Sequence, residues 1–186
     1  MKIAVMATGG VGGVFGAKLA QAGENVTFIA RGAHLEAIQN NGLTIAGDDG
    51  NQVLENIQTN HDPEAVGLVD VVMFAVKLWD TESAAEFCKP MLGPNTVLIP
   101  FQNGVVSTET ISKIIGEAHT GRGLSRVSAS IEAPGVIRQV GSFASLAFAE
   151  ADGARSPRME GFLAACKRAG IEAEIPKDIF RALWQK

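Results

Sequence analysis

Cationic and amide side chains follow three apolar segments that have the character of buried strands. Arg31 comes directly after NVTFIA, Lys77 after VVMFAV, and Gln102 and Asn103 after TVLIPF. The carboxyl ends of parallel strands line the ligand crevice of an open α/β sheet, so we expect these side chains at one edge. Cations there bind anionic groups, and an amide can bridge cofactor and substrate because it both donates and accepts. The alternatives are a lysine whose stem covers apolar surface and an ordinary Asn-Gly turn.

A glycine cluster follows the first apolar segment, Lys2–Met6. The stretch ATGGVG, residues 7–12, matches the G-x-G-x-x-G pattern of dinucleotide-binding turns except that Ala7 stands at the first glycine position. The first glycine of such a turn permits the tight bend, the second (Gly9) lets the backbone approach a pyrophosphate, and the third (Gly12) lets helix and strand pack closely. We expect alanine to be tolerated, because it adopts most backbone conformations outside the left-handed region.

The helix expected from about Gly10 would aim its free N–H groups and positive dipole end at phosphates. Arg31 stands where an NAD or S-adenosylmethionine site has an acid that accepts from ribose hydroxyls, and its planar fork suits a 2′-phosphate instead. The sequence therefore favours NADP(H), against the alternatives of a solvated arginine and a packing turn without a ligand. The candidate cofactor-binding residues are Ala7, Thr8, Gly9, Gly10, Val11, Gly12, Arg31, Lys77 and Asn103.

Strand and helix patterns alternate along the chain, which predicts an α/β fold: a Rossmann-like parallel sheet with helices on both faces. A later β-rich stretch, Thr120–Ala149, predicts an antiparallel extension, broken at Pro134-Gly135 and at Gly141. A hairpin is expected around GDDGN. The expected strands are Lys2–Met6, Asn25–Ala30, Val69–Val76, Thr96–Pro100 and Ile171–Ile175, and the expected helices are residues 11–22, His34–Asn41, Asp80–Met91, Val106–Ile115, Ser156–Ala169 and from Asp178 onward.

Composition excludes several classes of partner. The net charge is −4, and no basic run is longer than Lys167-Arg168, so a footprint for nucleic acid is missing. The two cysteines form no C-x-x-C, which fits a reducing cytoplasm, and no apolar stretch is long enough to span a membrane. The chain has no tyrosine, which excludes a phenolic proton donor within it. Its three histidines are scattered, so their spacing predicts no metal site, and we expect them on the surface or in loops.

Five segments, in order along essentially the whole chain, resemble the ketopantoate reductase (2-dehydropantoate 2-reductase) family. They are KIAVMATGGVGGVFGAKLAQAGENVTFIARG, FAVKLWDT, IPFQNG, EAPGVIRQVG and ALWQK. The resemblance implies NADPH-dependent reduction of the 2-oxo acid ketopantoate to pantoate, in pantothenate biosynthesis on the way to coenzyme A. It also implies that Arg31 and Lys77 hold the 2′-phosphate end of NADP, that Asn103 contacts cofactor and substrate, and that Lys186 is the catalytic lysine of an L-W-x-K motif. That lysine would donate a proton to the ketone oxygen.

Family members continue into a helical domain that supplies further substrate-binding residues. DIFRALWQK has the pattern of an amphipathic helix without a C-cap glycine, so we expect residues 1–176 to form the NADP-binding domain and 177–186 the first helix of the next one. The alternative is a frayed terminus. We expect this chain alone to bind cofactor without turnover, and a homodimer to form through the second domain. A related 2-oxo or hydroxy-acid dehydrogenase and a non-catalytic NADP(H)-sensing module remain the competing functions.

Overall fold

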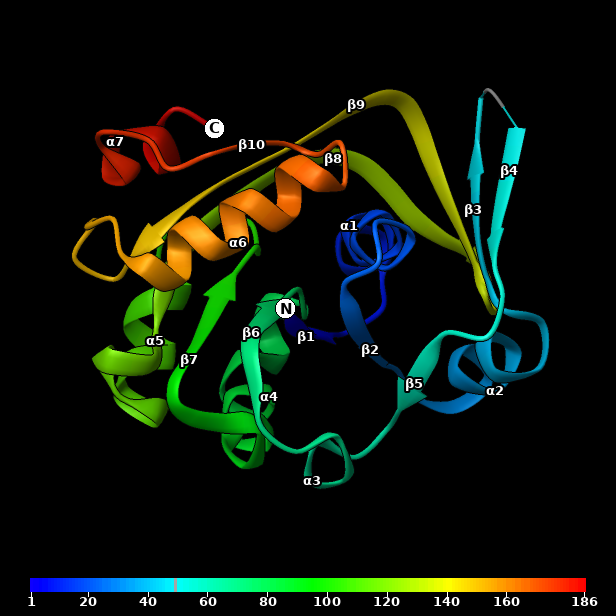
Figure 1. Ribbon diagram of the computed structural model, residues 1–186, viewed down its shortest axis with the longest axis horizontal. Helices are drawn as coiled ribbons and strands as arrows, with labels where there is room; N and C mark the ends of the chain where they lie inside the picture. Colours follow the sequence, from blue (N-terminus) through cyan, green and yellow to red (C-terminus); the bar gives the residue numbers. More distant parts are fainter. Residues whose placement is uncertain (49) are drawn as a thin grey trace.

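The computed structural model describes residues 1–48 and 50–186 as two sheets with helices between and outside them (Figure 1). Sheet A is parallel throughout and has the order β5-β2-β1-β6-β7, formed by β1 (Lys2–Met6), β2 (Asn25–Ile29), β5 (Gln58–Asn60), β6 (Val69–Phe74) and β7 (Leu92–Pro100). Sheet B has the order β10-β9-β3-β4, with β8 paired to β9, formed by β3 (Leu43–Gly47), β4 (Gly50–Leu54), β8 (Gly121–Ala133), β9 (Val136–Glu150) and β10 (Glu172–Glu174).

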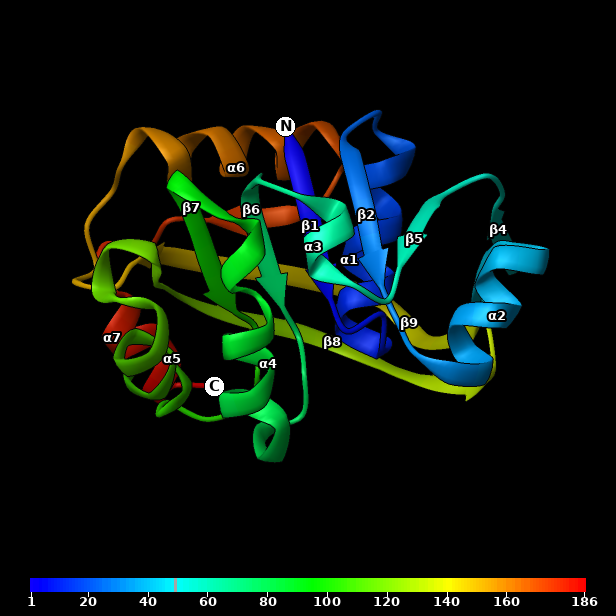
Figure 2. The same cartoon turned by 90° about the horizontal axis from the view of Figure 1, so that it is seen from below.

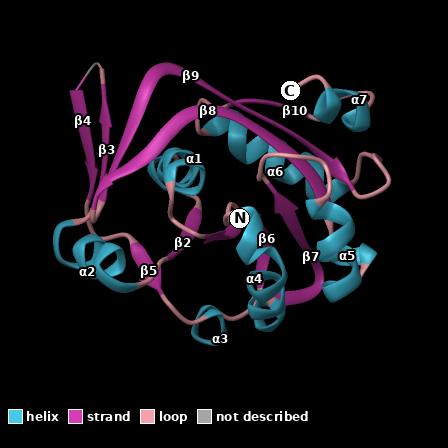
Figure 3. Ribbon diagram, turned by 180° about the vertical axis from the view of Figure 1, so that it is seen from behind, coloured by secondary structure: helices cyan, strands magenta, loops and turns pink. Residues whose placement is uncertain are grey.

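Helices lie on both faces of sheet A, as predicted. One face packs against α1 (Gly10–Gln21) and α6 (Pro157–Arg168), which sheet B covers from the other side (Figure 3). The opposite face packs against α4 (Thr81–Phe87) and α5 (Ser107–Ile115). The remaining elements are α2 (Gly32–Asn41), α3 (Pro63–Val66), α7 (Ile179–Trp184) and the 3₁₀ turns η1 (Leu78–Asp80), η2 (Lys89–Met91) and η3 (Glu117–His119).

Strand β6 illustrates why the parallel sheet could be predicted. Val71 and Met73 point into the core shared with α1 and α6, whereas Val72 and Phe74 point into the core shared with α4 and α5. Successive side chains alternate between the two faces, and both faces are covered, so every position from Val71 to Phe74 is apolar.

Sheet B and the segment after β6 differ from the expectation in detail. The extension is mixed, because β9 pairs in parallel with β3 and β10 and antiparallel only with β8. Gly141 does not end β9: the register moves from Val127 opposite Ala144 to Ser128 opposite Val140, so the strand continues through a bulge. The helix expected at Asp80–Met91 is α4 flanked by two 3₁₀ turns. Strands β3 and β4 form the expected hairpin, with Asp49 of its turn outside the described residues.

The turn between β1 and α1 corrects one expectation. Ala7 has a φ of 74°, in the left-handed region that the sequence argument assumed alanine would avoid. A Cβ at Gly12 would lie 2.3 Å from the Ala7 carbonyl oxygen and 2.8 Å from Val5, so the close helix–strand packing expected of the third glycine is confirmed. The bend therefore needs a left-handed residue, and alanine occupies it at the cost of backbone strain.

Glu24 joins three distant parts of the fold. Its carboxylate accepts from the Met1 ammonium at 2.7 Å and from Arg168, at the end of α6, and its side chain is 5% exposed. Burial by itself raises the pKa of Glu24, but the hydrogen bonds and charges of these two cations outweigh burial and hold the pKa below its ordinary value.

Cys88 and Cys166 are free, buried thiols, and burial raises the pKa of each to about 12. Across the described ranges, no three His, Cys, Asp or Glu side chains are grouped to hold a metal ion. None of the helices there is both long and apolar enough to cross a lipid bilayer.

We expect Ala7→Gly to stabilise the protein by about 1 kcal/mol, because glycine relieves the left-handed strain while adding some chain entropy to the unfolded state. Urea unfolding measures the effect. Ala30→Gly is the matched control, since Ala30 also lines the end of a strand but lacks a positive φ, and it should destabilise. A lower free energy of unfolding for Ala7→Gly would contradict the conclusion that Ala7 is strained.

We expect Glu24→Gln to lower the free energy of unfolding by about 1.5–3 kcal/mol at pH 7, the range for hydrogen bonds to charged groups. Because the folded pKa of Glu24 lies below 4.5, its contribution is full above that pH and disappears as pH falls through the folded value. Unfolding at pH 7 and at low pH should therefore show a difference that shrinks with acid. Glu172→Gln, at an exposed position on β10, is the control, and a pH-independent difference would contradict the assignment.

Candidate functional site

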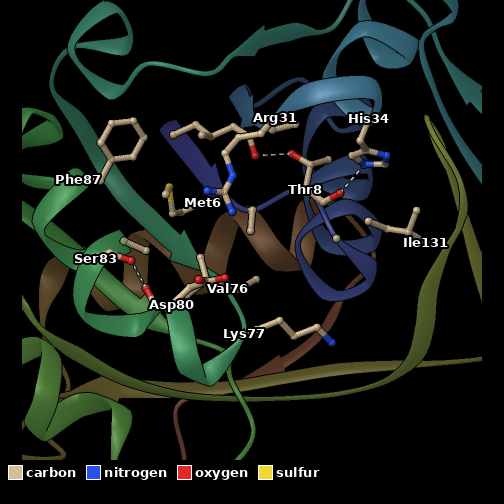
Figure 4. Close-up of a pocket in the computed structure, with 16 residues that line it drawn as sticks. Met6, Thr8, Arg31, His34, Val76, Lys77, Asp80, Ser83, Phe87 and Ile131 are labelled. Atoms are coloured by element: carbon tan, nitrogen blue, oxygen red, sulfur yellow. Dashed lines mark hydrogen bonds between the residues drawn. The ribbon is translucent and has the colours of Figure 1, made fainter.

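A cavity of about 540 Å³ lies at the carboxyl ends of β1, β2 and β6 (Figure 4). These ends share one edge of sheet A, seen in Figure 2, at the point where the chain order of the strands reverses around β1. Most of its wall is apolar. The lining residues are Met6, Ala7, Thr8, Gly9, Ile29, Ala30, Arg31, His34, Ala75, Val76, Lys77, Asp80, Ser83, Ala84, Phe87 and Ile131.

The glycine turn forms the floor beside the start of α1. A Cβ at Gly9 would meet nothing within 4 Å, whereas one at Gly10 would lie 2.2 Å from the carbonyl oxygen of Ala129 on β8. Gly9 therefore faces the open side of the turn, and Gly10 and Gly12 face protein. No side chain caps α1 at Gly9 and no acid lies in its first turn, so its N–H groups and dipole suit an anionic group such as a pyrophosphate.

Thr8 fixes the turn to the end of β2. Its Oγ1 and its backbone N–H both donate to the carbonyl oxygen of Ile29, each at 3.0 Å. The side chain is buried, so its hydroxyl is already used within the protein, and Thr8 borders the cavity through its backbone.

His34 holds the same turn from the other side. Its Nδ1 accepts from the N–H of Gly135 at 3.0 Å, so Nε2 carries the proton and donates to the carbonyl oxygen of Thr8 at 2.7 Å. We expected a surface or loop histidine, but His34 is half-buried on α2 and links the β1–α1 turn to the β8–β9 hairpin. With both nitrogens engaged, it is a positioning residue.

Arg31 and Lys77 both line the cavity, from the ends of β2 and β6. In Figure 4 the Arg31 guanidinium reaches over the cavity, while Lys77 extends on the far side of Val76, so the two cations do not converge on one point. Asp80 makes no side-chain capping hydrogen bond at the start of α4, and its carboxylate lines the cavity. The one sequence signal for its presence in the cavity wall is its position shortly after Lys77, which itself follows a strand.

Gln102 does not line the cavity, contrary to the expectation for a bridging amide. It is buried, and its Nε2 donates to the carbonyl oxygen of Val76 at 3.0 Å and to Thr81 Oγ1 at 2.9 Å. The side chain therefore holds the loop between β6 and α4, which carries Lys77, against the end of β7.

Asn103 and Lys186 form a second group at the same edge of sheet A. The Lys186 Nζ donates to Asn103 Oδ1 at 2.9 Å, although 83 residues separate them. Partial desolvation, and to a lesser degree the nearby charge of Arg126, lower the pKa of Lys186 below its ordinary value. An ammonium with a lowered pKa, held by an amide, is suited to donating a proton.

The structure thus divides the predicted residues. Five of them line the cavity: Ala7, Thr8, Gly9, Arg31 and Lys77. Three others, Gly10, Val11 and Gly12, belong to the start of α1 and are not part of the lining. The last two, Asn103 and Lys186, contact each other away from the cavity. The sequence analysis missed the apolar wall of Met6, Ile29, Phe87 and Ile131, because these residues meet only when the chain folds.

Comparison with known proteins shows which family the chain is similar to. The family described as "Ketopantoate reductase PanE/ApbA" matches residues 3–153. A 2-dehydropantoate 2-reductase of Mesorhizobium japonicum is 34% identical over the whole chain and 63% of its own length. A putative ketopantoate reductase from Ralstonia solanacearum MolK2 has a TM-score of 0.89 at 32% identity over 99% of this chain and 63% of its own. The 2-dehydropantoate 2-reductase structure from Geobacter metallireducens GS-15 has a TM-score of 0.92 at 26% identity, over 100% of this chain and 61% of its own.

The chain spans about 63% of the length of the Mesorhizobium relative and 61% of the Geobacter structure. The match to the family covers the glycine turn, the cavity and the long hairpin of sheet B. With that match, and with relatives and solved structures of the same kind aligned along the whole chain, this chain belongs to the ketopantoate reductase PanE/ApbA family.

Proposed function

We propose that the protein carrying this chain reduces a 2-oxo acid, ketopantoate first among them, to the 2-hydroxy acid with NADPH. The observation that carries the proposal is the 2.9 Å contact between Lys186 Nζ and Asn103 Oδ1, at the sheet edge that also bears the cavity. Membership of the family supports the same chemistry and a place in pantothenate biosynthesis.

The cavity fits a dinucleotide by its shape and by its polar groups. Open space above Gly9 leaves room for a pyrophosphate at the uncapped start of α1, and the apolar wall between Ile29 and Phe87 suits an adenine ring. Arg31 stands where an acid would accept from a ribose, and its guanidinium suits the 2′-phosphate of NADP. Asp80 on the opposite side acts against that preference, since a carboxylate repels a phosphate.

When bound, the reduced nicotinamide supplies a hydride to the ketone carbon of the substrate. Lys186 holds the proton that the ketone oxygen needs as negative charge develops on it, and its lowered pKa makes the ammonium a stronger acid. Asn103 accepts from that ammonium through Oδ1 and fixes its direction, while its own NH₂ group is free to donate to a ligand. Gln102 keeps the two sides of the site aligned through Val76.

We expect the protein to bind NADPH more tightly than NADH, and Arg31→Ala to remove most of that preference at a cost of about 1.5–3 kcal/mol in NADPH binding. Isothermal titration with both cofactors measures it. Asp80→Asn is the matched partner variant and should strengthen NADPH binding, because it removes the opposing charge. Equal affinities of the unmodified chain for the two cofactors would contradict the role of Arg31.

We expect Lys186→Ala in the full-length protein to lower kcat for ketopantoate by about 10²–10⁴-fold, the usual contribution of a positioned general acid, and to leave NADPH affinity unchanged. Lys177→Ala, at an exposed lysine just before α7, is the control and should keep full activity. Undiminished turnover by Lys186→Ala would overturn the lysine assignment and leave the cofactor site standing.

The same assay tests the pKa of Lys186. Only the protonated form donates, so kcat is full at lower pH and falls as pH rises through the pKa, which lies below the ordinary 10.5. Lys186→Arg should retain little activity and lose this basic limb, because a guanidinium does not deprotonate in the accessible range.

A further inference from the structure

Arg126 on β8 is a partly buried cation without an acidic partner among the residues that the structure describes. Four arginines are half-buried within residues 1–48 and 50–186, namely Arg122, Arg126, Arg138 and Arg158. Three of them form ion pairs with Glu109, Glu132 and Glu150 respectively. Over the same residues Arg126 has no ion pair and no side-chain hydrogen bond. A half-buried charge costs solvation free energy, which in the other three cases the glutamate offsets.

The pleat of β8 determines where Arg126 points. Ser125 Oγ donates to the carbonyl oxygen of Phe101 at 3.2 Å, and a Cβ at Gly123 would lie 2.7 Å from Ile99, so these odd positions face β7. The even positions therefore face the other side of the strand, where α7 lies. The guanidinium of Arg122 confirms this direction, because it lies 4.5 Å above the ring of Phe180 on α7.

Arg126 lies on this same face, four residues further along β8, toward the Lys186 end of α7. In keeping with this placement, the positive charge of Arg126 is one cause, after desolvation, of the lowered pKa of Lys186. Lys186 itself bonds to Asn103, which follows β7 two residues after the Phe101 that Ser125 contacts. Within the described residues, two cations and an amide thus lie at one edge with no Asp or Glu side chain paired to either cation, an arrangement that favours a bound anion.

We propose that Arg126 binds the carboxylate of the 2-oxo acid and so leaves the Lys186 ammonium for the ketone oxygen; this inference rests on the proposed function. A 2-oxo acid carries its carboxylate on the carbon next to the ketone, so two neighbouring donors are required, one for each group. The planar fork of arginine matches the two oxygens of a carboxylate, whereas an ammonium is a point charge that suits a single oxygen. Arg126 would then select 2-oxo acids over neutral ketones.

The test compares ketopantoate with its neutral methyl ester in the full-length protein, for the unmodified enzyme and for Arg126→Gln, Arg126→Lys and Arg122→Gln. We expect Arg126→Gln to raise KM for ketopantoate by roughly 10- to 100-fold with a much smaller change in kcat, the loss of one charged hydrogen-bonding group. Its KM for the ester should stay near that of the unmodified enzyme, so the preference for the acid disappears. Arg126→Lys, which keeps the positive charge, should recover part of the preference for the acid.

Arg122→Gln removes an equal charge from the same face of the same strand and should keep the preference for the acid. A KM for ketopantoate in Arg126→Gln within twofold of the unmodified enzyme would overturn the inference. So would an equal loss with acid and ester, which would indicate a structural role. If the unmodified enzyme reduces no 2-oxo acid at all, the proposed function fails and this inference with it, whereas an active enzyme with an unaffected Arg126→Gln leaves the proposed function intact.

Discussion

Helix α1 lies between the two sheets with no room for a side chain at Gly13 or Gly16, and the rest of the structure depends on that close approach. A Cβ at Gly13 would lie 1.9 Å from Ile137 on β9, and one at Gly16 would lie 2.7 Å from Phe28 on β2. Glycine at these positions lets sheet B cover the helix while the helix covers sheet A. The same packing directs the one unobstructed turn residue, Gly9, toward the cavity.

The cavity at the ends of β1, β2 and β6 and the Lys186–Asn103 pair are separate groups that one buried amide connects. Gln102 precedes Asn103 in the chain, and its Nε2 bonds to the carbonyl oxygen of Val76, the residue before Lys77. A shift of the β6–α4 loop would therefore carry over to the end of β7. In the proposed reduction of a ketone, the alignment of hydride donor and proton donor would depend on such coupling, because small displacements at the reacting atoms lower rates strongly.

Local pattern in the sequence was enough to predict four of the five strands of sheet A, namely β1, β2, β6 and β7, and the helices that cover them. Alternation in β6 and the glycines after β1 act over a few residues, so the sequence alone predicts this strand and this turn. The helices expected from Ser156 and from Asp178 begin directly after these residues, and each of the two side chains caps its helix. Strand β5 escaped prediction because Gln58–Asn60 is short and polar and is a strand only through pairing with β2. The 3₁₀ turns around α4 escaped it because their residues continue the helical pattern.

What the sequence by itself determined is the fold class, the glycine turn and the residue types at the strand ends, since these follow from periodicity and chemistry within short segments. The tertiary structure decided which of them meet. Lys186 contacts Asn103, 83 residues earlier in the chain. His34 bonds both to Thr8 in the turn and to Gly135, which lies 101 residues after His34. Only the folded chain shows the left-handed backbone of Ala7, because the tight bend between β1 and α1 requires this φ against the preference of alanine.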